Sequence, residues 1–112
     1  MEEKLLALEK CFFDETFIAD EKWLDSVIHC DFLEYGKSGS FFRKADTIEG
    51  LLSCSGNREI EINDFSCEEV VADCWLVHYV TGLPGEKYYR TSLWVRENGC
   101  LQLRFHQASA MK

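Results

Sequence analysis

The feature that most constrains the fold is the pair Asn98-Gly99, which stands between two long segments rich in β-branched and aromatic residues. Both central residues of a two-residue type I′ turn need a positive φ, and asparagine and glycine adopt such angles most readily. The pair therefore predicts a β-hairpin whose strands run over 87–97 and 100–108.

Pairing counted outward from this turn divides the hairpin into two faces. One face carries three opposed pairs: Trp94 with Leu103, Ser92 with Phe105, and Arg90 with Gln107. A large aromatic and two apolar side chains around a few polar groups are typical of a ligand pocket, so we expect this face to be concave. The other face suits either a dimer contact or water, and it carries Tyr89, Thr91, Leu93, Val95, Gln102, Arg104 and His106. A one-residue bulge would exchange part of this assignment.

Upstream of the hairpin, the sequence predicts helices first and strands afterwards. Apolar residues recur at three- and four-residue steps in the first helix, and Asp20 is a suitable N-cap for the second. The predicted elements are, in order, helices over 3–15 and 20–31, a strand over 31–36 that turns at Lys37-Ser-Gly39, a helix over 45–52 that ends in the polar run 53–57, and strands over 59–66 and 74–81. Leu83-Pro-Gly-Glu86 supplies the turn before the final hairpin. This order indicates an α+β fold and not alternating βαβ units.

The length and composition are those of one globular domain. A chain of 112 residues with 46% hydrophobic and 29% charged residues can bury roughly two thirds of its unfolded surface around one core. The N-terminus lacks a basic segment followed by an apolar run, and no stretch approaches the roughly 18 apolar residues of a membrane span, so we predict a cytoplasmic protein. A net charge of -8 argues against nucleic acid and membranes as partners, because nucleic acid and anionic lipid both demand a basic surface.

The cysteines predict neither disulfides nor a metal site. No export signal exposes them to an oxidising compartment, so we interpret them as reduced and mostly buried. No Cys-x-x-Cys pair or His-Glu-x-x-His motif offers the ligand spacing of zinc, and Cys74 with His78 supplies only two ligands. A glycine-rich phosphate loop is also lacking, and no cofactor is predicted. The six cysteines are Cys11, Cys30, Cys54, Cys67, Cys74 and Cys100.

Basic residues are concentrated toward the C-terminus. Residues 1–73 carry 7 basic and 18 acidic side chains, whereas residues 74–112 carry 5 basic and 2 acidic ones. The arginines of the final hairpin therefore either pair with acidic helices or bind an anionic ligand. Arg90 beside Gln107 suits a carboxylate, which arginine binds through paired donors. The alternative partner of Arg90 is Glu34 or an acidic residue of a helix.

Three short segments carry a resemblance to a known superfamily. Together with the order of elements, Asp31-Phe-Leu-Glu-Tyr-Gly-Lys-Ser-Gly39, Arg90-Thr-Ser-Leu-Trp94 and Phe105-His-Gln107 resemble the nuclear transport factor 2-like superfamily, and within it a small bacterial branch of unknown function related to SnoaL-like cyclases. The resemblance covers residues 1–112 as one domain. It implies a cone-shaped, cystatin-like α+β roll, in which N-terminal helices pack in a strongly curved antiparallel sheet with a pocket open at one end. It also implies a homodimer formed through the outer face of the sheet.

Relatives in this superfamily include ketosteroid isomerase, dehydratases, epoxide hydrolases and a kinase association domain, so the fold alone does not identify a function. The first hypothesis is a homodimeric small-molecule-binding domain. Its predicted ligand-binding residues are Tyr35, Arg90, Ser92, Trp94, Phe105 and Gln107. Trp75 and Tyr79 either extend the pocket wall or belong to the core.

The second hypothesis is an isomerase, dehydratase or hydrolase. Glu34 is its candidate base, because desolvation in a pocket raises the pKa of a carboxyl, and Arg90 or Ser92 would orient an oxyanion. Ser92 is not predicted to be a nucleophile, since no histidine and acid are recognisably placed to activate it. His106 falls on the outer face, which argues against an acid/base role. The third hypothesis is a non-catalytic assembly module that acts through its sheet.

Overall fold

The computed structural model describes residues 1–54, 60–83 and 85–112. Parts of three predicted features lie outside the described residues: the end of the polar run 53–57, the strand start at Glu59, and the turn residue Pro84. The elements are α1 (Glu2–Cys11), α2 (Glu15–Ile18), α3 (Glu21–Val27), β1 (Ile28–Tyr35), β2 (Phe41–Arg43), α4 (Lys44–Leu52), β3 (Glu61–Val71), β4 (Cys74–Leu83), β5 (Glu86–Glu97) and β6 (Cys100–Ala110).

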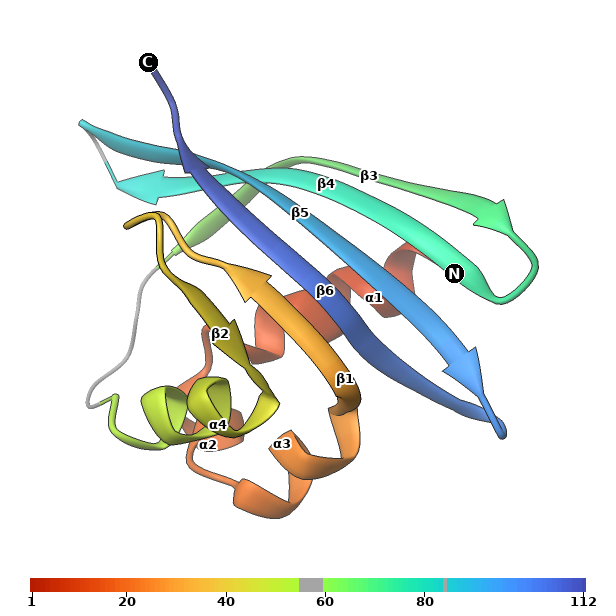
Figure 1. The fold of residues 1–112 in the computed structure, drawn as a ribbon. Coiled ribbons are helices and arrows are strands. Elements are labelled where there is room, and N and C mark those ends of the chain that lie inside the picture. Colours follow the sequence, from red (N-terminus) through yellow and green to blue (C-terminus); the bar gives the residue numbers. More distant parts are fainter. Residues whose placement is uncertain (55–59, 84) are drawn as a thin grey trace.

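The strands form one curved sheet in the order β2-β1-β6-β5-β4-β3, and the four helices of the described residues lie along one side of it (Figure 1). Neighbouring strands are antiparallel except for β1 and β6, which run parallel. The predicted α+β roll is thus confirmed, with one parallel pair inside a sheet expected to be antiparallel throughout. This pair brings the strand that follows the helices beside the last strand of the chain.

The first predicted helix is interrupted. It stops at Cys11 and not at Glu15, because Asp14 begins a second helix. The side chain of Asp14 accepts a hydrogen bond of 2.8 Å from the backbone N–H of Thr16, and an aspartate in this position satisfies one of the orphan donors of a helix start. The periodic apolar pattern continues across the break, so the pattern alone did not reveal it.

The following helix begins as predicted and ends early. Asp20 caps α3 by accepting a hydrogen bond of 3.1 Å from the backbone N–H of Trp23. The helix ends at Val27, and Ile28 already has extended backbone angles and begins β1. The first strand therefore starts before the predicted Asp31.

The final hairpin turns where the sequence predicts. Asn98 and Gly99 have φ values of 51° and 77°, which are the positive angles of a type I′ turn. Next to the turn, Trp94 pairs with Leu103 as expected.

Among the described helices, none has the length and hydrophobicity needed to cross a membrane.

A bulge then shifts the register of the hairpin by one residue between Leu93 and Trp94. The predicted pairs of Ser92 with Phe105 and of Arg90 with Gln107 are wrong, because the structure pairs Ser92 with His106 and Arg90 with Ala108. A single extra residue moves every later side chain of that strand to the opposite face. His106 consequently points to the helical side, and Phe105 and Gln107 point away from it.

The core lies between the helices and the inner face of the sheet. Its buried apolar side chains are Leu5, Leu24, Val27, Ile28, Phe32, Trp75, Val77, Tyr79, Trp94 and Leu103. The cysteines contribute less than predicted: all six thiols are free, three are exposed and three are half-buried. The prediction of mostly buried cysteines is wrong, because Cys54 follows the end of α4 and Cys100 follows the hairpin turn, where little packs over a side chain.

Candidate functional site

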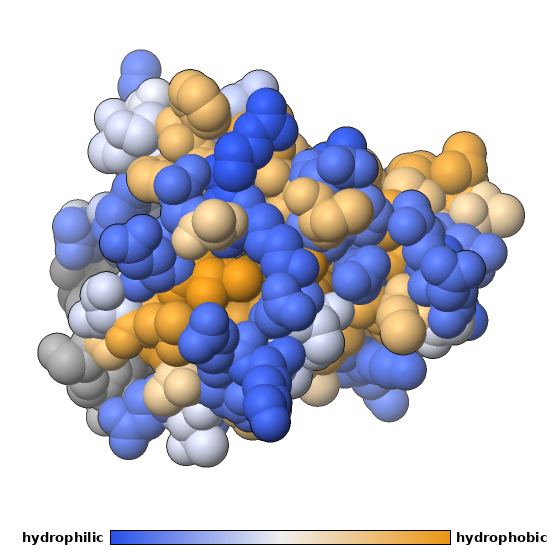
Figure 2. Space-filling view, turned by 60° about the horizontal axis from the view of Figure 1, so that its bottom comes forward, coloured by the Kyte–Doolittle hydropathy of each residue, from blue (hydrophilic) through white to orange (hydrophobic). Residues whose placement is uncertain are grey.

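A cavity of about 230 Å³ opens between the helices and the inner face of the sheet. Aromatic rings form much of its wall, and carboxylates, an arginine and a histidine supply its polar groups. Its lining residues are Glu9, Phe12, Phe13, Phe32, Glu34, Phe42, Asp46, Thr47, Gly50, Leu51, Tyr79, Arg90, Leu103 and His106. Seen from the end where α2, α3 and α4 lie, the surface shows an apolar region framed by hydrophilic side chains (Figure 2). A largely apolar cavity with convergent polar groups is the usual form of a small-molecule site.

The carboxyl of Glu9 is a buried polar group of the cavity, since only 2% of the residue's accessible surface is exposed. Glu9 lies on α1, on the same helical face as the buried Leu5 one turn earlier. The hydroxyl of Tyr79 donates to its Oε1 at 2.5 Å, and the indole N–H of Trp94 donates to its Oε2 at 2.8 Å. Buried acids are rare unless such donors satisfy them.

Arg90 belongs to a hydrogen-bonded chain with two buried side chains of the sheet, His106 and Ser92. The hydroxyl of Ser92 lies 2.8 Å from Nδ1 of His106. On the other side of the imidazole ring, Nε2 lies 3.2 Å from Nη1 of Arg90. The guanidinium of Arg90 also donates from Nε to the hydroxyl of Thr81 at 2.6 Å and lies over the ring of a cavity-lining phenylalanine.

The direction of every hydrogen bond in this chain follows from its arginine end. A guanidinium can only donate, so Nε2 of His106 must accept from Arg90. A neutral imidazole then carries its proton on Nδ1 and donates to Ser92. This direction is opposite to the one that a nucleophilic serine needs, because here the histidine donates to Ser92 and cannot take its proton.

Burial perturbs the acid–base behaviour of three groups in this site. Desolvation raises the pKa of the Glu9 carboxyl, although hydrogen bonds from Tyr79, Ser92 and Trp94 and the charge of Arg90 oppose that rise. Desolvation, with the charge and hydrogen bond of Glu9, raises the pKa of Tyr79 well above its ordinary value. Desolvation, with the positive charge of Arg90, lowers the pKa of His106 from 6.5 to about 3. His106 is therefore neutral at physiological pH, as the hydrogen-bond directions require.

The structure brings some predicted site residues together and separates others. Glu34 and Arg90 both line the cavity, and an oxygen of Glu34 lies 3.4 Å from the hydroxyl of Thr47, which donates to it. Ser92 and Trp94 are fully buried behind the cavity wall, where they hold Glu9 and His106.

Three predicted ligand-binding residues lie away from this cavity. Tyr35, Phe105 and Gln107 lie on the outer face of the sheet, where the rings of Tyr35 and Phe105 meet edge to face at 5.5 Å between centroids. The bulge in β6 explains the errors at Phe105 and Gln107. Tyr35 alternates with Glu34 along β1, and Glu34 is the one that turns inward.

The two central groups of the site, Glu9 and His106, are not among the ligand-binding residues predicted from the sequence. His106 was assigned to the outer face because the bulge is not visible in the sequence. Glu9 does leave a signal, since it stands four residues after Leu5 and three before Phe12, inside the apolar stripe of its helix. A charged residue on a buried stripe is uncommon unless it has a partner.

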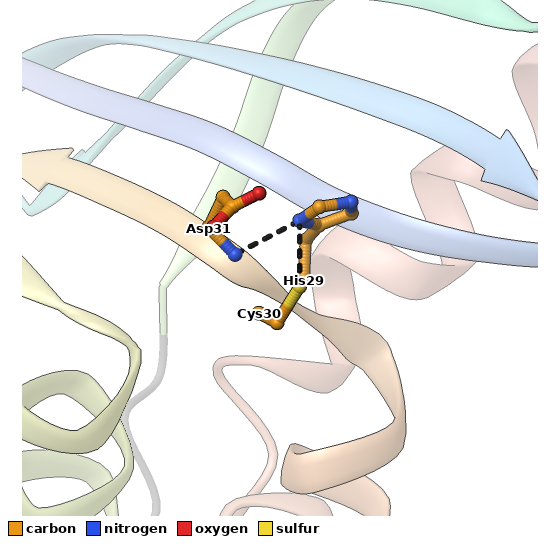
Figure 3. Close-up of side chains that lie close together, drawn as sticks. All are labelled: His29, Cys30 and Asp31. Atoms are coloured by element: carbon orange, nitrogen blue, oxygen red, sulfur yellow. Dashed lines mark hydrogen bonds between the residues drawn. The ribbon is translucent and has the colours of Figure 1, made fainter.

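A second cluster of potential ligands lies at the start of β1, where side-chain atoms of His29, Cys30 and Asp31 come within 4.8 Å of one another (Figure 3). Both ring nitrogens of His29 already have partners. Nδ1 accepts a hydrogen bond of 2.9 Å from the backbone N–H of Asp31, and Nε2 lies 3.1 Å from the carboxylate of Glu97. A metal would have to displace one of these hydrogen bonds, so we interpret the cluster as a structural element of the strand.

Solved structures with the same arrangement of elements identify the fold. An NTF2-like protein from Cytophaga hutchinsonii superposes with a TM-score of 0.79 at 18% identity, covering 97% of each chain. The chain has the nuclear transport factor 2-like fold. A protein of unknown function from the DUF3225 family of Pectobacterium atrosepticum is similar at TM-score 0.79 and 13% identity, covering 98% of this chain and 87% of that one.

An uncharacterised protein with a cystatin-like fold from Caulobacter vibrioides is similar at TM-score 0.74 and 12% identity, covering 96% of this chain and 87% of that one. No family model matches the sequence, and no curated protein matches it either. Identities this low establish the nuclear transport factor 2-like fold, and the function has to be argued from the site.

Proposed function

We propose that this chain is a small-molecule-binding domain that works as a homodimer and holds a ligand about the size of one ring in its cavity. The observation that carries the proposal is the cavity of about 230 Å³, walled by aromatic rings around the buried Glu9. An engineered cavity of about 150 Å³ in another protein is large enough for benzene, so this volume suits a ring with one small polar substituent.

The polar groups support a binding site rather than a simple packing defect. Packing defects are lined by apolar atoms, whereas this cavity contains a carboxyl, a guanidinium and an imidazole whose positions are fixed by hydrogen bonds. Fixed polar groups in an apolar cavity orient a ligand at little entropic cost.

Native mass spectrometry of the purified protein, compared with the denatured chain, tests this function. We expect a discrete extra mass in the native spectrum. Thr47→Trp should fill the cavity and abolish the extra mass, because Thr47 lines it. Glu49→Trp on the exposed surface of the same helix is the matched control and should keep the ligand. An extra mass that survives Thr47→Trp would place the ligand elsewhere and contradict the proposal.

The proposed dimer forms through the outer face of the sheet. Four half-buried apolar side chains from four neighbouring strands lie in register there, and we call them the outer row: Leu33, Phe105, Leu93 and Leu76. The helices lie on the opposite side of the sheet (Figure 1). A continuous apolar row without charged members favours a second copy of the same face as its partner, since symmetric dimers bury one patch against itself.

Light scattering during size-exclusion chromatography tests this interface. Leu93→Glu introduces a charge into the outer row, and we expect it to convert the dimer into a monomer. Ser66→Glu on the edge strand β3 places the same charge outside the row and should leave the dimer intact. A monomeric wild-type protein, or a Leu93→Glu variant that remains dimeric, would rule out this interface.

A proton-transfer enzyme of the isomerase, dehydratase or hydrolase kind is the second candidate. The raised pKa of Glu9 favours it, because a carboxyl of this kind accepts protons better than an exposed one. Glu34 remains a candidate base at the same cavity. If the retained ligand has an acidic C–H bond, the wild-type protein should exchange that hydrogen for deuterium in heavy water, and Glu9→Gln or Glu34→Gln should slow the exchange. Equal exchange with and without protein would exclude this candidate for that ligand.

A further inference from the structure

Arg90 is held at the cavity by two buried neutral side chains. Its Nε donates to the hydroxyl of Thr81 at 2.6 Å, and its Nη1 lies 3.2 Å from Nε2 of His106. Because a guanidinium only donates, this ring nitrogen is the acceptor. The exposed fractions of Thr81 and His106 are 1% and 8%. The ring of Phe13 lies against the guanidinium, with 5.3 Å between Cζ of Arg90 and the ring centroid. These contacts position the guanidinium before a ligand arrives.

Nη2 is the nitrogen of Arg90 with donors to spare. A guanidinium carries five N–H groups, and two of them belong to this atom. Among the residues that the structure describes, none accepts a hydrogen bond from Nη2 or forms an ion pair with Arg90. A buried donor without an acceptor costs free energy. Arg90 lines the cavity, so a ligand there can supply the acceptor that Nη2 lacks.

The contacts of Arg90 favour a single acceptor atom over a carboxylate. Arginine binds a carboxylate best through two parallel N–H groups on neighbouring nitrogens, and each such pair combines Nη2 with either Nε or Nη1. Nε has given its only N–H to Thr81, and Nη1 already donates to His106. The amide that the sequence placed beside Arg90 is also missing from the cavity, because Arg90 pairs with Ala108 and Gln107 faces outward. Nη2 is therefore suited to one acceptor oxygen.

The charge of the chain favours an uncharged ligand. The net charge is -8, and residues 1–73 carry 18 acidic and 7 basic side chains. These residues include the four helices of the described chain, which lie on the side of the sheet where the cavity opens (Figure 1). An anion that enters the cavity loses its hydration and meets this negative field. An uncharged carbonyl gives up far less hydration and still accepts a charge-assisted hydrogen bond from a guanidinium.

Two carboxyl groups of the cavity already have donors from the protein. The oxygens of Glu9 accept from Tyr79 and from Trp94. Glu34 accepts from Thr47. A ligand is not needed to supply donors to these two acids, so Arg90 decides which polar group a ligand presents.

We propose, on the basis of the ligand-binding function proposed above, that the cavity takes an uncharged ring compound with one acceptor oxygen and that Nη2 of Arg90 donates to this oxygen. The aromatic walls contact the ring, and Arg90 fixes its orientation. A carbonyl group attached to the ring is the simplest group that accepts without donating. Binding involves no covalent step and no proton transfer.

Acetophenone is the probe for the test. Its matched comparator is α-methylstyrene, in which a methylene group replaces the carbonyl oxygen with little change of shape, and benzoate is the anionic comparator. Calorimetric titration measures the three values of Kd. We expect acetophenone to bind about tenfold more tightly than α-methylstyrene, a factor that corresponds to about 1.4 kcal/mol. Benzoate should bind more weakly than acetophenone.

Arg90→Met removes the donors and keeps an unbranched side chain at the cavity. This variant should bind acetophenone and α-methylstyrene with equal affinity. Arg96→Met is the matched control, because Arg96 is an exposed arginine of the same strand, and it should keep the preference for acetophenone. A preference that persists in Arg90→Met would overturn the proposal.

A second readout uses the wild-type protein and does not depend on whether a variant folds. Infrared spectroscopy of acetophenone labelled with carbon-13 at the carbonyl should show a C=O stretch at lower frequency in the complex than in hexane. An unshifted stretch, equal affinity of the wild type for acetophenone and α-methylstyrene, tighter binding of benzoate, or no binding of acetophenone would each overturn the proposal. A discrete retained mass that Thr47→Trp removes would show, in any of these cases, that the ligand-binding function stands and that the ligand class is wrong.

Discussion

The hydrogen bond between Tyr79 and Glu9 should be one of the strongest single contacts in the molecule. The hydroxyl lies 2.5 Å from the carboxyl oxygen, and both residues are 2% exposed. Tyr79→Phe removes the donor and leaves the ring in place. A hydrogen bond to a charged group contributes about 1.5–3 kcal/mol, so we expect the free energy of unfolding to fall by about 2 kcal/mol. For a chain of this length, each kcal/mol corresponds to about 4 °C in Tm.

The size of this loss should depend on pH in a defined direction. The Tyr79 hydrogen bond lowers the pKa of Glu9 against the larger effect of burial, so its removal raises that pKa further. The variant can then avoid a poorly solvated carboxylate by protonating Glu9. We therefore expect the deficit of Tyr79→Phe to be largest at high pH and to shrink as the pH falls through the folded-state pKa of Glu9.

Urea unfolding at a fixed protein concentration measures these differences. Tyr88→Phe is the matched control, because its hydroxyl makes an exposed contact of 3.3 Å with Glu86, and it should change stability by less than about 0.5 kcal/mol. In a Glu9→Gln background, Tyr79→Phe should cost at least 1 kcal/mol less than in the wild type, as roughly expected for two groups in direct contact. An equal cost in both backgrounds would refute the claim that Tyr79 stabilises the protein through Glu9.

Two further results are expected. Burial lowers the pKa of His106 from 6.5 to about 3, so between these pH values the unfolded chain binds more protons than the folded one. Wild-type stability should therefore fall by up to about 1.4 kcal/mol per pH unit as the pH drops through that window. Urea titrations should show this slope reduced in His106→Asn. Gly82→Ala should destabilise the protein by about 1–3 kcal/mol, because the added Cβ would collide with the backbone of Glu86 and Lys87. Gly50→Ala in α4 adds a Cβ that meets open space, so it should stabilise the protein by about 0.5–1 kcal/mol and raise the Tm by a few degrees.

Much of the fold was predictable because its signals are local. Asn98-Gly99 fixes a hairpin through the angles that these two residues adopt, and Asp20 fixes a helix start through a hydrogen bond to the third residue after it. Such signals act over a few residues and are readable in one sequence. The break at Asp14 is also local, yet the apolar stripe that continues across it conceals the break.

The site was less predictable because its contacts join distant parts of the chain. Glu9 meets Tyr79 and Trp94, which follow it by 70 and 85 residues. Helical periodicity shows only that Glu9 faces inward. Which donors await it there depends on how β4 and β5 pack against α1, and a single sequence does not contain that information.

One irregularity in β6 accounts for both the correct and the wrong parts of the site prediction. Arg104 is the extra residue of the bulge, and its Nη1 donates at 2.6 Å to the backbone carbonyl of Asp31, in the stretch of β1 where the pairing with β6 is also irregular. The bulge is therefore stabilised by a contact between strands that are distant in sequence, without a glycine or proline to announce it.

The same bulge connects the two surfaces of the sheet. Before it, the alternation of β6 follows the turn at Asn98-Gly99; after it, His106 turns inward and Phe105 turns outward. His106 thereby reaches Ser92 and Arg90, while Phe105 joins the outer row. If Arg104 were paired with Leu93 in a regular ladder, Phe105 would take the inward position of His106, and Arg104 would interrupt the outer row. The hydrogen-bonded network and the apolar outer face thus depend on one backbone feature.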